Sequence, residues 1–134
     1  MKDEFFEWTD DYSVGIKEID AQHKRLFDII NNFYEAFIQG KADLVVSETL
    51  DELLLYTRYH FKSEETLMKE YDLPDITAHQ RKHREFEDEI MKRIDDLKRK
   101  DGKVHYKTMN YLKDWLLGHI LGMDKNYFKN LDID

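Results

Sequence analysis

Residues 50–71 read LDELLLYTRYHFKSEETLMKEY, a stretch in which apolar side chains recur every three or four positions and neither proline nor glycine occurs. This period is typical of an amphipathic α-helix with one buried face. The same face carries His60 and Glu64, which lie one helical turn apart and therefore project to the same side. The stretch predicts a helix that carries a histidine and a glutamate into the protein core.

The rest of the chain is equally poor in residues that interrupt helices, with one proline and five glycines among 134 residues. Apolar side chains keep a helical spacing in three further segments, and the breaks between them are short, which favours antiparallel neighbours. We therefore predict an all-α fold, an up-down-up-down antiparallel four-helix bundle with a non-helical N-terminal arm, as a single domain. The arm is expected at 1–19 and the helices at about 20–39, 43–71, 74–100 and 105–130.

Three residues are suited to the expected helix ends. Asp20 is a typical N-cap for the first helix, Gly40 can follow its last turn in a left-handed conformation, and Pro74 fits the first turn of the third helix. The arm is too apolar to extend into solvent, so we expect it to pack across the bundle. Its aromatic side chains are Phe5, Phe6, Trp8 and Tyr12.

Composition narrows the classes of function. The absence of cysteine excludes disulfides, iron–sulfur clusters and cysteine nucleophiles. A net charge of −8 would repel nucleic acid, so no nucleic-acid partner is expected. Apolar runs are too short to span a membrane, and residues 1–11 do not resemble a secretion signal. We expect a cytoplasmic protein without a membrane partner, and the surface does not indicate a protein partner.

Polar side chains on the predicted buried faces of the helices indicate what the protein binds. Five of the six histidines fall on core-facing positions, and all four expected helices contribute. His23 by itself would be a hydrogen-bonded core histidine, but burying all these groups without partners would cost several kcal/mol. Bound divalent metal ions would satisfy them together, whereas His105 lies off the pattern and is expected to be exposed. The predicted ligands are His23, His60, Glu64, His79, His83, His119 and Asp124.

Seven ligands are too many for one tetrahedral zinc, and imidazole with carboxylate suits iron better than manganese or zinc. If Glu64 and Asp124 both bridged two six-coordinate ions, together with one oxo or hydroxo from solvent, one position would stay open for a small ligand. Asp124 is five residues after His119, about 140° away on an ideal helix. A local π-type widening, eased by Gly118 and Gly122, would bring the two together.

The combined motifs resemble the hemerythrin family, specifically its single-domain bacterial members. They are Val14-Gly15-Ile16 with Ile19-Asp20-x-Gln22-His23, His60-Phe61-x-x-Glu64-Glu65 with Met68, His79-x-x-x-His83-x-x-Phe86, and His119-Ile120-x-x-x-Asp124-x-x-Tyr127.

The resemblance implies that His79, His83 and His119 hold one iron. It implies that His23 and His60 hold the other, which keeps the open position for dioxygen or for anions such as azide. Glu64 and Asp124 would bridge the two irons. By its helical register, Glu65 is expected to point outward and not to be a ligand. The expected apolar walls of the oxygen pocket are Leu26, Phe61, Trp115 and Leu116.

Two other functions compete with oxygen binding. One is a di-iron redox enzyme acting on peroxide or nitric oxide, and the other is metal storage. Ferritin-like di-iron enzymes pair Glu-x-x-His motifs, and no histidine of this chain has a glutamate three residues before it. We therefore expect a protein that is not an enzyme and that binds dioxygen reversibly for storage, delivery or sensing.

Overall fold

The computed structural model describes residues 7–128, and the side chains of all of these except 120 and 121. Every long element in this part of the chain is a helix, and it contains no strand. In chain order the elements are a short 3₁₀ turn η1 (Asp10–Tyr12), α1 (Lys17–Ile38), α2 (Ala42–Glu70), α3 (Ile76–Lys98), α4 (Val104–Leu117), the π-helical segment η2 (Gly118–Asp124) and α5 (Lys125–Phe128).

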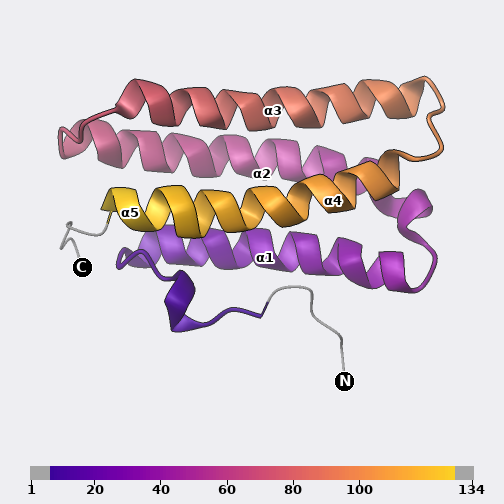
Figure 1. Cartoon of the computed structure of the whole chain (residues 1–134), viewed down its shortest axis with the longest axis horizontal. Coiled ribbons are helices and arrows are strands. Elements are labelled where there is room, and N and C mark those ends of the chain that lie inside the picture. The colour runs from indigo at the N-terminus through magenta and orange to yellow at the C-terminus, as the bar shows by residue number, and fades with distance from the viewer. Residues whose placement is uncertain (1–6, 129–134) are drawn as a thin grey trace.

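The helices form four antiparallel rods, because α4, η2 and α5 continue one another along a single axis (Figure 1). The chain runs up α1, down α2, up α3 and down the last rod, as the short connections predicted. The predicted up-down-up-down four-helix bundle is confirmed. None of the helices in residues 7–128 is long and apolar enough to cross a membrane.

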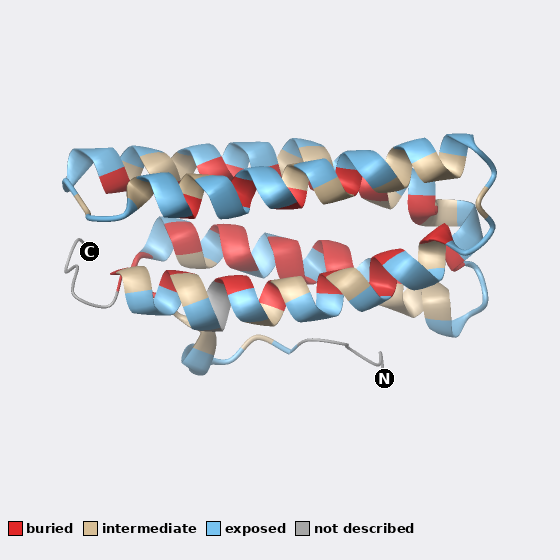
Figure 2. Ribbon diagram, turned by 45° about the horizontal axis from the view of Figure 1, so that its top comes forward, coloured by how far each residue is buried: buried red, intermediate tan, exposed pale blue. Residues whose placement is uncertain are grey.

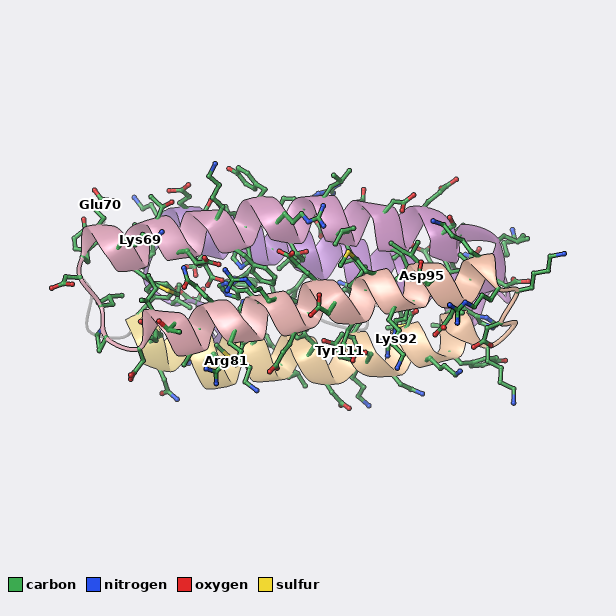
Figure 3. All side chains as sticks on the ribbon, turned by 90° about the horizontal axis from the view of Figure 1, so that it is seen from above. Lys69, Glu70, Arg81, Lys92, Asp95 and Tyr111 are labelled. Carbon is green, nitrogen blue, oxygen red and sulfur yellow. The ribbon has the colours of Figure 1, made fainter. Side chains whose placement is uncertain are left out.

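Buried residues lie on the sides of the helices that face one another, and exposed residues lie on the outer sides (Figure 2). Charged residues such as Lys69, Arg81 and Lys92 project from the outer faces of α2 and α3 (Figure 3). This division follows from the apolar stripe that each helix carries, since burial of that stripe is the main stabilising term.

The apolar interior consists of two clusters. The larger includes Leu26, Phe61 and Leu116, whereas the smaller includes Ile19, Met68 and Phe128. On α1 and the last rod, the histidines and acids predicted as ligands fall between these two sets, and on α2 Glu64 does so while His60 lies next to Phe61. The fold therefore encloses a polar layer between two apolar clusters.

The N-terminal arm packs on α1 as predicted. The rings of Trp8 and Tyr12 lie 5.3 and 4.9 Å from the ring of Phe27, both edge to face. Phe5 and Phe6 lie outside the described residues.

The arm is shorter than predicted, because α1 begins at Lys17 and not at residue 20. Asp20 is therefore inside the first turn, and its carboxylate accepts hydrogen bonds from the Ser13 hydroxyl and the Val14 amide. Predicting Asp20 as the N-cap was wrong, although the side chain does hold the arm to the helix.

Other helix ends differ by a few residues. The third helix starts at Ile76, after Asp75 adopts a left-handed φ of 61°, so Pro74 lies before its first turn and not within it. It stops at Lys98, because Lys100 takes the left-handed conformation (φ 64°) that ends the helical path. Gly40 follows α1 with φ 73°, which confirms its predicted role.

Candidate metal centre

Each rod of the bundle contributes side chains to the polar layer. On α2, His60 and Glu64 are one turn apart, and on α3 the same spacing aligns His79 with His83. All seven predicted ligands are buried, none more than 4% exposed. The structure therefore brings all seven residues together, from elements far apart in the sequence.

The π-helical segment η2 resolves the angular problem of the last pair. Residues Gly118–Asp124 are wound more widely than an α-helix, so five residues complete about one turn. His119 Nε2 consequently lies 2.9 Å from Asp124 Oδ2. The widening predicted from the spacing is present in the structure.

Each carboxylate faces histidines from several helices. Glu64 Oε1 lies 3.2 Å from the Nε2 atoms of His60, His83 and His119. Asp124 Oδ1 lies 3.1 Å from His79 Nε2, and Oδ2 lies 2.9 Å from His23 Nε2. The two acids therefore occupy the centre of the layer, where bridging ligands would have to be.

These close approaches are not hydrogen bonds. Among the described residues, no hydrogen-bond partner is found for the Nε2 atoms of the five histidines or for either oxygen of Glu64 and Asp124. Nine buried polar atoms that converge without hydrogen bonds would be strongly destabilising in a core without ions. Imidazole nitrogen and carboxylate oxygen are suitable donors for iron, so the residues present fit a metal centre.

The charge balance of the layer also calls for a cation. Burial alone raises the pKa of Glu64, but His60 and His119 outweigh burial and hold that pKa well below its ordinary value. Burial lowers the pKa of His119, but the carboxylates of Asp124 and Glu64 raise it to about 10. A protonated His119 thus offsets the buried negative charge, and a divalent cation can replace its proton.

Two groups of potential ligands share Glu64. One comprises Glu64 with His79 and His83, and in each group the ligand atoms lie within 4.8 Å of one another. The other comprises His23, His60, Glu64, His119 and Asp124. His119 thus lies with His23 and His60, while the resemblance to hemerythrins implies that it shares an ion with His79 and His83.

The expected pocket walls lie around the histidines. Leu26, Phe61 and Leu116 are buried, and Trp115 is half-buried. Phe61 stacks on the His83 ring at 3.9 Å between centroids, and Trp115 stacks on the His119 ring at 4.9 Å. The aromatic walls therefore hold two of the imidazole planes in place.

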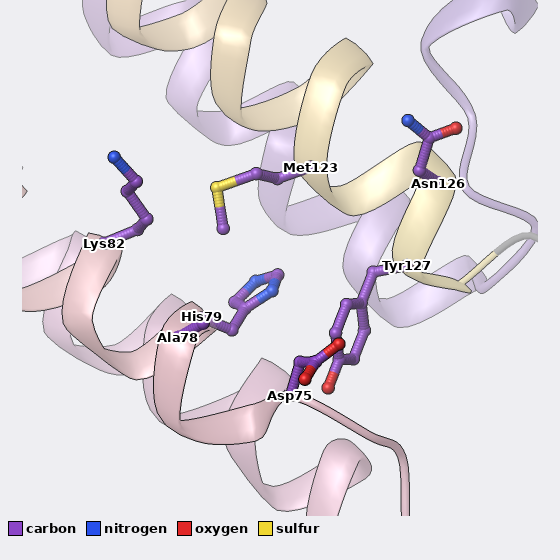
Figure 4. Close-up of a pocket in the computed structure, with 7 residues that line it drawn as sticks. All are labelled: Asp75, Ala78, His79, Lys82, Met123, Asn126 and Tyr127. Atoms are coloured by element: carbon purple, nitrogen blue, oxygen red, sulfur yellow. The ribbon is translucent and has the colours of Figure 1, made fainter.

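A surface pocket of about 370 Å³ lies beside the layer, on its His79 side (Figure 4). The His79 ring projects into it from α3, with Met123 and Tyr127 on the opposite side. The Tyr127 ring lies 4.7 Å from the His79 ring, and its hydroxyl donates a hydrogen bond to the carbonyl of Pro74. Solvent therefore comes close to this edge of the layer, although the His79 ring itself is only 2% exposed.

Two residues next to the layer were missed by sequence reasoning. Gln22 Oε1 is 2.7 Å from His60 Nδ1, and Glu65 Oε2 is 2.8 Å from His83 Nδ1. The expectation that Glu65 points outward was wrong, since its half-buried side chain reaches from α2 across to α3. Gln22 was detectable, because it lies on the same apolar stripe as Ile19 and Leu26.

His105, expected to be exposed, is half-buried. Its ring lies 4.2 Å from that of Tyr106 and 6.2 Å from that of Phe37, at the end of the bundle where α4 begins. It takes no part in the polar layer, so it serves as a control for the other histidines.

A buried layer of imidazoles around two shared carboxylates, inside an antiparallel four-helix bundle, defines a metal-binding helical protein. Residues 14–131 match the family model described as the hemerythrin HHE cation binding domain. The chain is 34% identical over 123 residues to a bacteriohemerythrin of Pseudomonas aeruginosa, covering 90% of this chain and 77% of that protein. It is 32% identical over 125 residues to a bacteriohemerythrin of Methylococcus capsulatus, covering 90% of this chain and 92% of that protein.

Solved structures agree with the sequence comparisons. Wild-type hemerythrin superimposes with a TM-score of 0.84 at 28% identity, covering 96% of this chain and 99% of that one. A mutant hemerythrin gives 0.86 at 27% identity, covering 98% and 100%. This chain belongs to the hemerythrin family.

Proposed function

We propose that this protein binds dioxygen reversibly at a pair of iron ions. In the proposed centre, His79, His83 and His119 hold one ion and His23 and His60 hold the other. The two carboxylates, Glu64 and Asp124, would be shared by both ions, together with an oxo or hydroxo from solvent. When bound, the iron pair supplies the electrons that dioxygen takes up and later returns.

The observation that carries this proposal is the set of nine buried donor atoms without hydrogen bonds, contributed by all four rods. The number of donors supports two ions, because no single ion accommodates so many protein ligands. The names of the relatives, bacteriohemerythrin, support dioxygen as the ligand.

The protein residues contribute positioning and the exclusion of water. Leu26, Phe61 and Leu116 present hydrocarbon or ring faces around the layer, and Trp115 covers His119. Leu26, Phe61 and Leu116 have no N–H or O–H group in their side chains, so this part of the wall offers no proton to the site and favours release of dioxygen over its reduction. This property supports reversible binding over turnover of peroxide or nitric oxide.

The test begins with iron content and the absorption spectrum. Protein reduced without air and then exposed to air should develop a charge-transfer band that disappears when dioxygen is removed. Rapid irreversible oxidation with consumption of peroxide would indicate a redox enzyme. A colourless protein containing zinc would indicate metal storage.

Two histidine variants separate a specific site from adventitious iron. Changing His79 to Ala should remove the metal, whereas changing His105 to Ala should leave two irons per chain, since His105 lies outside the layer. Azide should bind to wild-type protein at one iron only. Equal retention of iron in both variants, or azide at both irons, would contradict the assignment.

A further inference from the structure

Two histidines of the layer form hydrogen bonds through the ring nitrogen that faces away from the layer, and the two acceptors differ in kind. The His60 ring donates from Nδ1 to the amide oxygen of Gln22, at 2.7 Å, and the His83 ring donates from Nδ1 to the carboxylate of Glu65, at 2.8 Å. Both contacts occupy the ring nitrogen opposite the one that faces the polar layer. Each acceptor therefore fixes the tautomer whose Nε2 lone pair is free for a ligand role.

The orientation of Gln22 is determined by its neighbours. Its Nε2 donates to the hydroxyl of Ser63 at 3.1 Å, and that hydroxyl donates its own proton to the carbonyl of Tyr59 at 3.2 Å. Because the Ser63 proton is already used, the serine can only accept from Gln22. The amide oxygen of Gln22 must then face His60, as a neutral acceptor.

Glu65 differs because its carboxylate only accepts hydrogen bonds. Its second oxygen accepts from Gln80 Nε2 at 2.9 Å, so both oxygens are occupied and the side chain is held in place. An anionic acceptor draws the Nδ1 proton more strongly than an amide does. The His83 imidazole is therefore the stronger electron donor to an ion and the better stabiliser of a highly charged one.

We propose that Glu65 and Gln22 are positioning residues that widen the difference between the two metal positions towards electron loss, beyond the difference that three histidines against two already create. The position that includes His83 loses its electron first, because Glu65 adds negative charge behind that ligand and Gln22 adds none behind His60. This inference rests on the proposed di-iron function. In the first oxidation one electron passes from the ferrous pair to a one-electron mediator dye, and the proton between His83 and Glu65 stays in place.

The test is a potentiometric titration of the iron-loaded full chain, with iron affinity measured by competition with a chelator. Changing Glu65 to Gln keeps the shape and an acceptor but removes the charge, and Gln80 can turn its amide to match. The first oxidation should become at least tenfold less favourable, about 59 mV for one electron. Iron affinity should fall about 10- to 100-fold.

The matched control is Glu70→Gln, which removes an equal charge from the exposed end of the same helix. This variant should leave the potentials of both one-electron oxidations unchanged. Gln22→Glu should act in the opposite sense, making the second oxidation more favourable, since a glutamate there can accept from His60, and also from Ser63 once that hydroxyl turns away from the Tyr59 carbonyl. The double variant Gln22→Glu with Glu65→Gln exchanges the two acceptors. It should restore a difference in potential between the two oxidations.

Equal shifts in the Glu65→Gln and Glu70→Gln variants would overturn the proposal, and so would coincident steps in wild-type protein. If Glu65→Gln failed to hold iron, the Gln22→Glu variant would decide, and an unchanged second step would refute the proposal. Wild-type protein without iron would instead refute the proposed function. The two failures are therefore distinguishable.

Discussion

Phe61 links the stability of the bundle to the protection of the polar layer. The side chain is 2% exposed, and its ring stacks on His83 with an interplanar angle of 2°. Changing Phe61 to Ala should lower the free energy of unfolding by about 3–5 kcal/mol, the usual loss for a buried phenylalanine. At about 2.1 cal/mol/K per residue of unfolding entropy, this corresponds to a melting temperature roughly 10–18 °C lower.

The assay is denaturant unfolding of the metal-free protein, followed by oxidation of the iron-loaded protein in air. Because the alanine opens a space beside His83, water should reach the layer and irreversible oxidation should accelerate. The matched control is Phe33→Ala, which empties an equally buried place in the larger cluster, outside the polar layer. It should cost similar stability without faster oxidation. A loss below about 1 kcal/mol for Phe61→Ala, or equal acceleration in both variants, would refute the reasoning.

Three further predictions concern the protonation of His119 and the glycine that follows α1. His119, with a pKa raised to about 10, is protonated at pH 8 in the metal-free protein, so metal binding should release about one more proton per chain at pH 8 than well above pH 10, in addition to any proton lost by the solvent bridge. Calorimetry in buffers of different ionisation enthalpy measures this release. The same raised pKa stabilises the metal-free fold below about pH 6.5, and that contribution should be lost as the pH rises through 10, which thermal melts would detect. Gly40→Ala should cost about 1–2 kcal/mol because φ is +73°, whereas Gly102→Ala, with no positive φ and open space at Cβ, should be nearly neutral in the same unfolding assay.

The sequence by itself determined the four helices and most of the polar layer. The spacing of apolar residues and the scarcity of proline and glycine distinguish helix from strand along the chain. Pairs such as His60 and Glu64 share a face of the helix because they are one turn apart. The angular mismatch between His119 and Asp124 could also be recognised from spacing, since it follows from helix geometry alone.

Only the tertiary structure decided how the layer is supported. Glu65 contacts His83 because α2 and α3 pack side by side, and Gln22 faces His60 because Ser63 occupies its other end. Helix ends such as Asp75 depended on loop conformation, and His105 was half-buried by its neighbour Phe37. Periodicity reports which side of a helix a residue occupies, whereas a contact between helices depends on how their axes are placed in space.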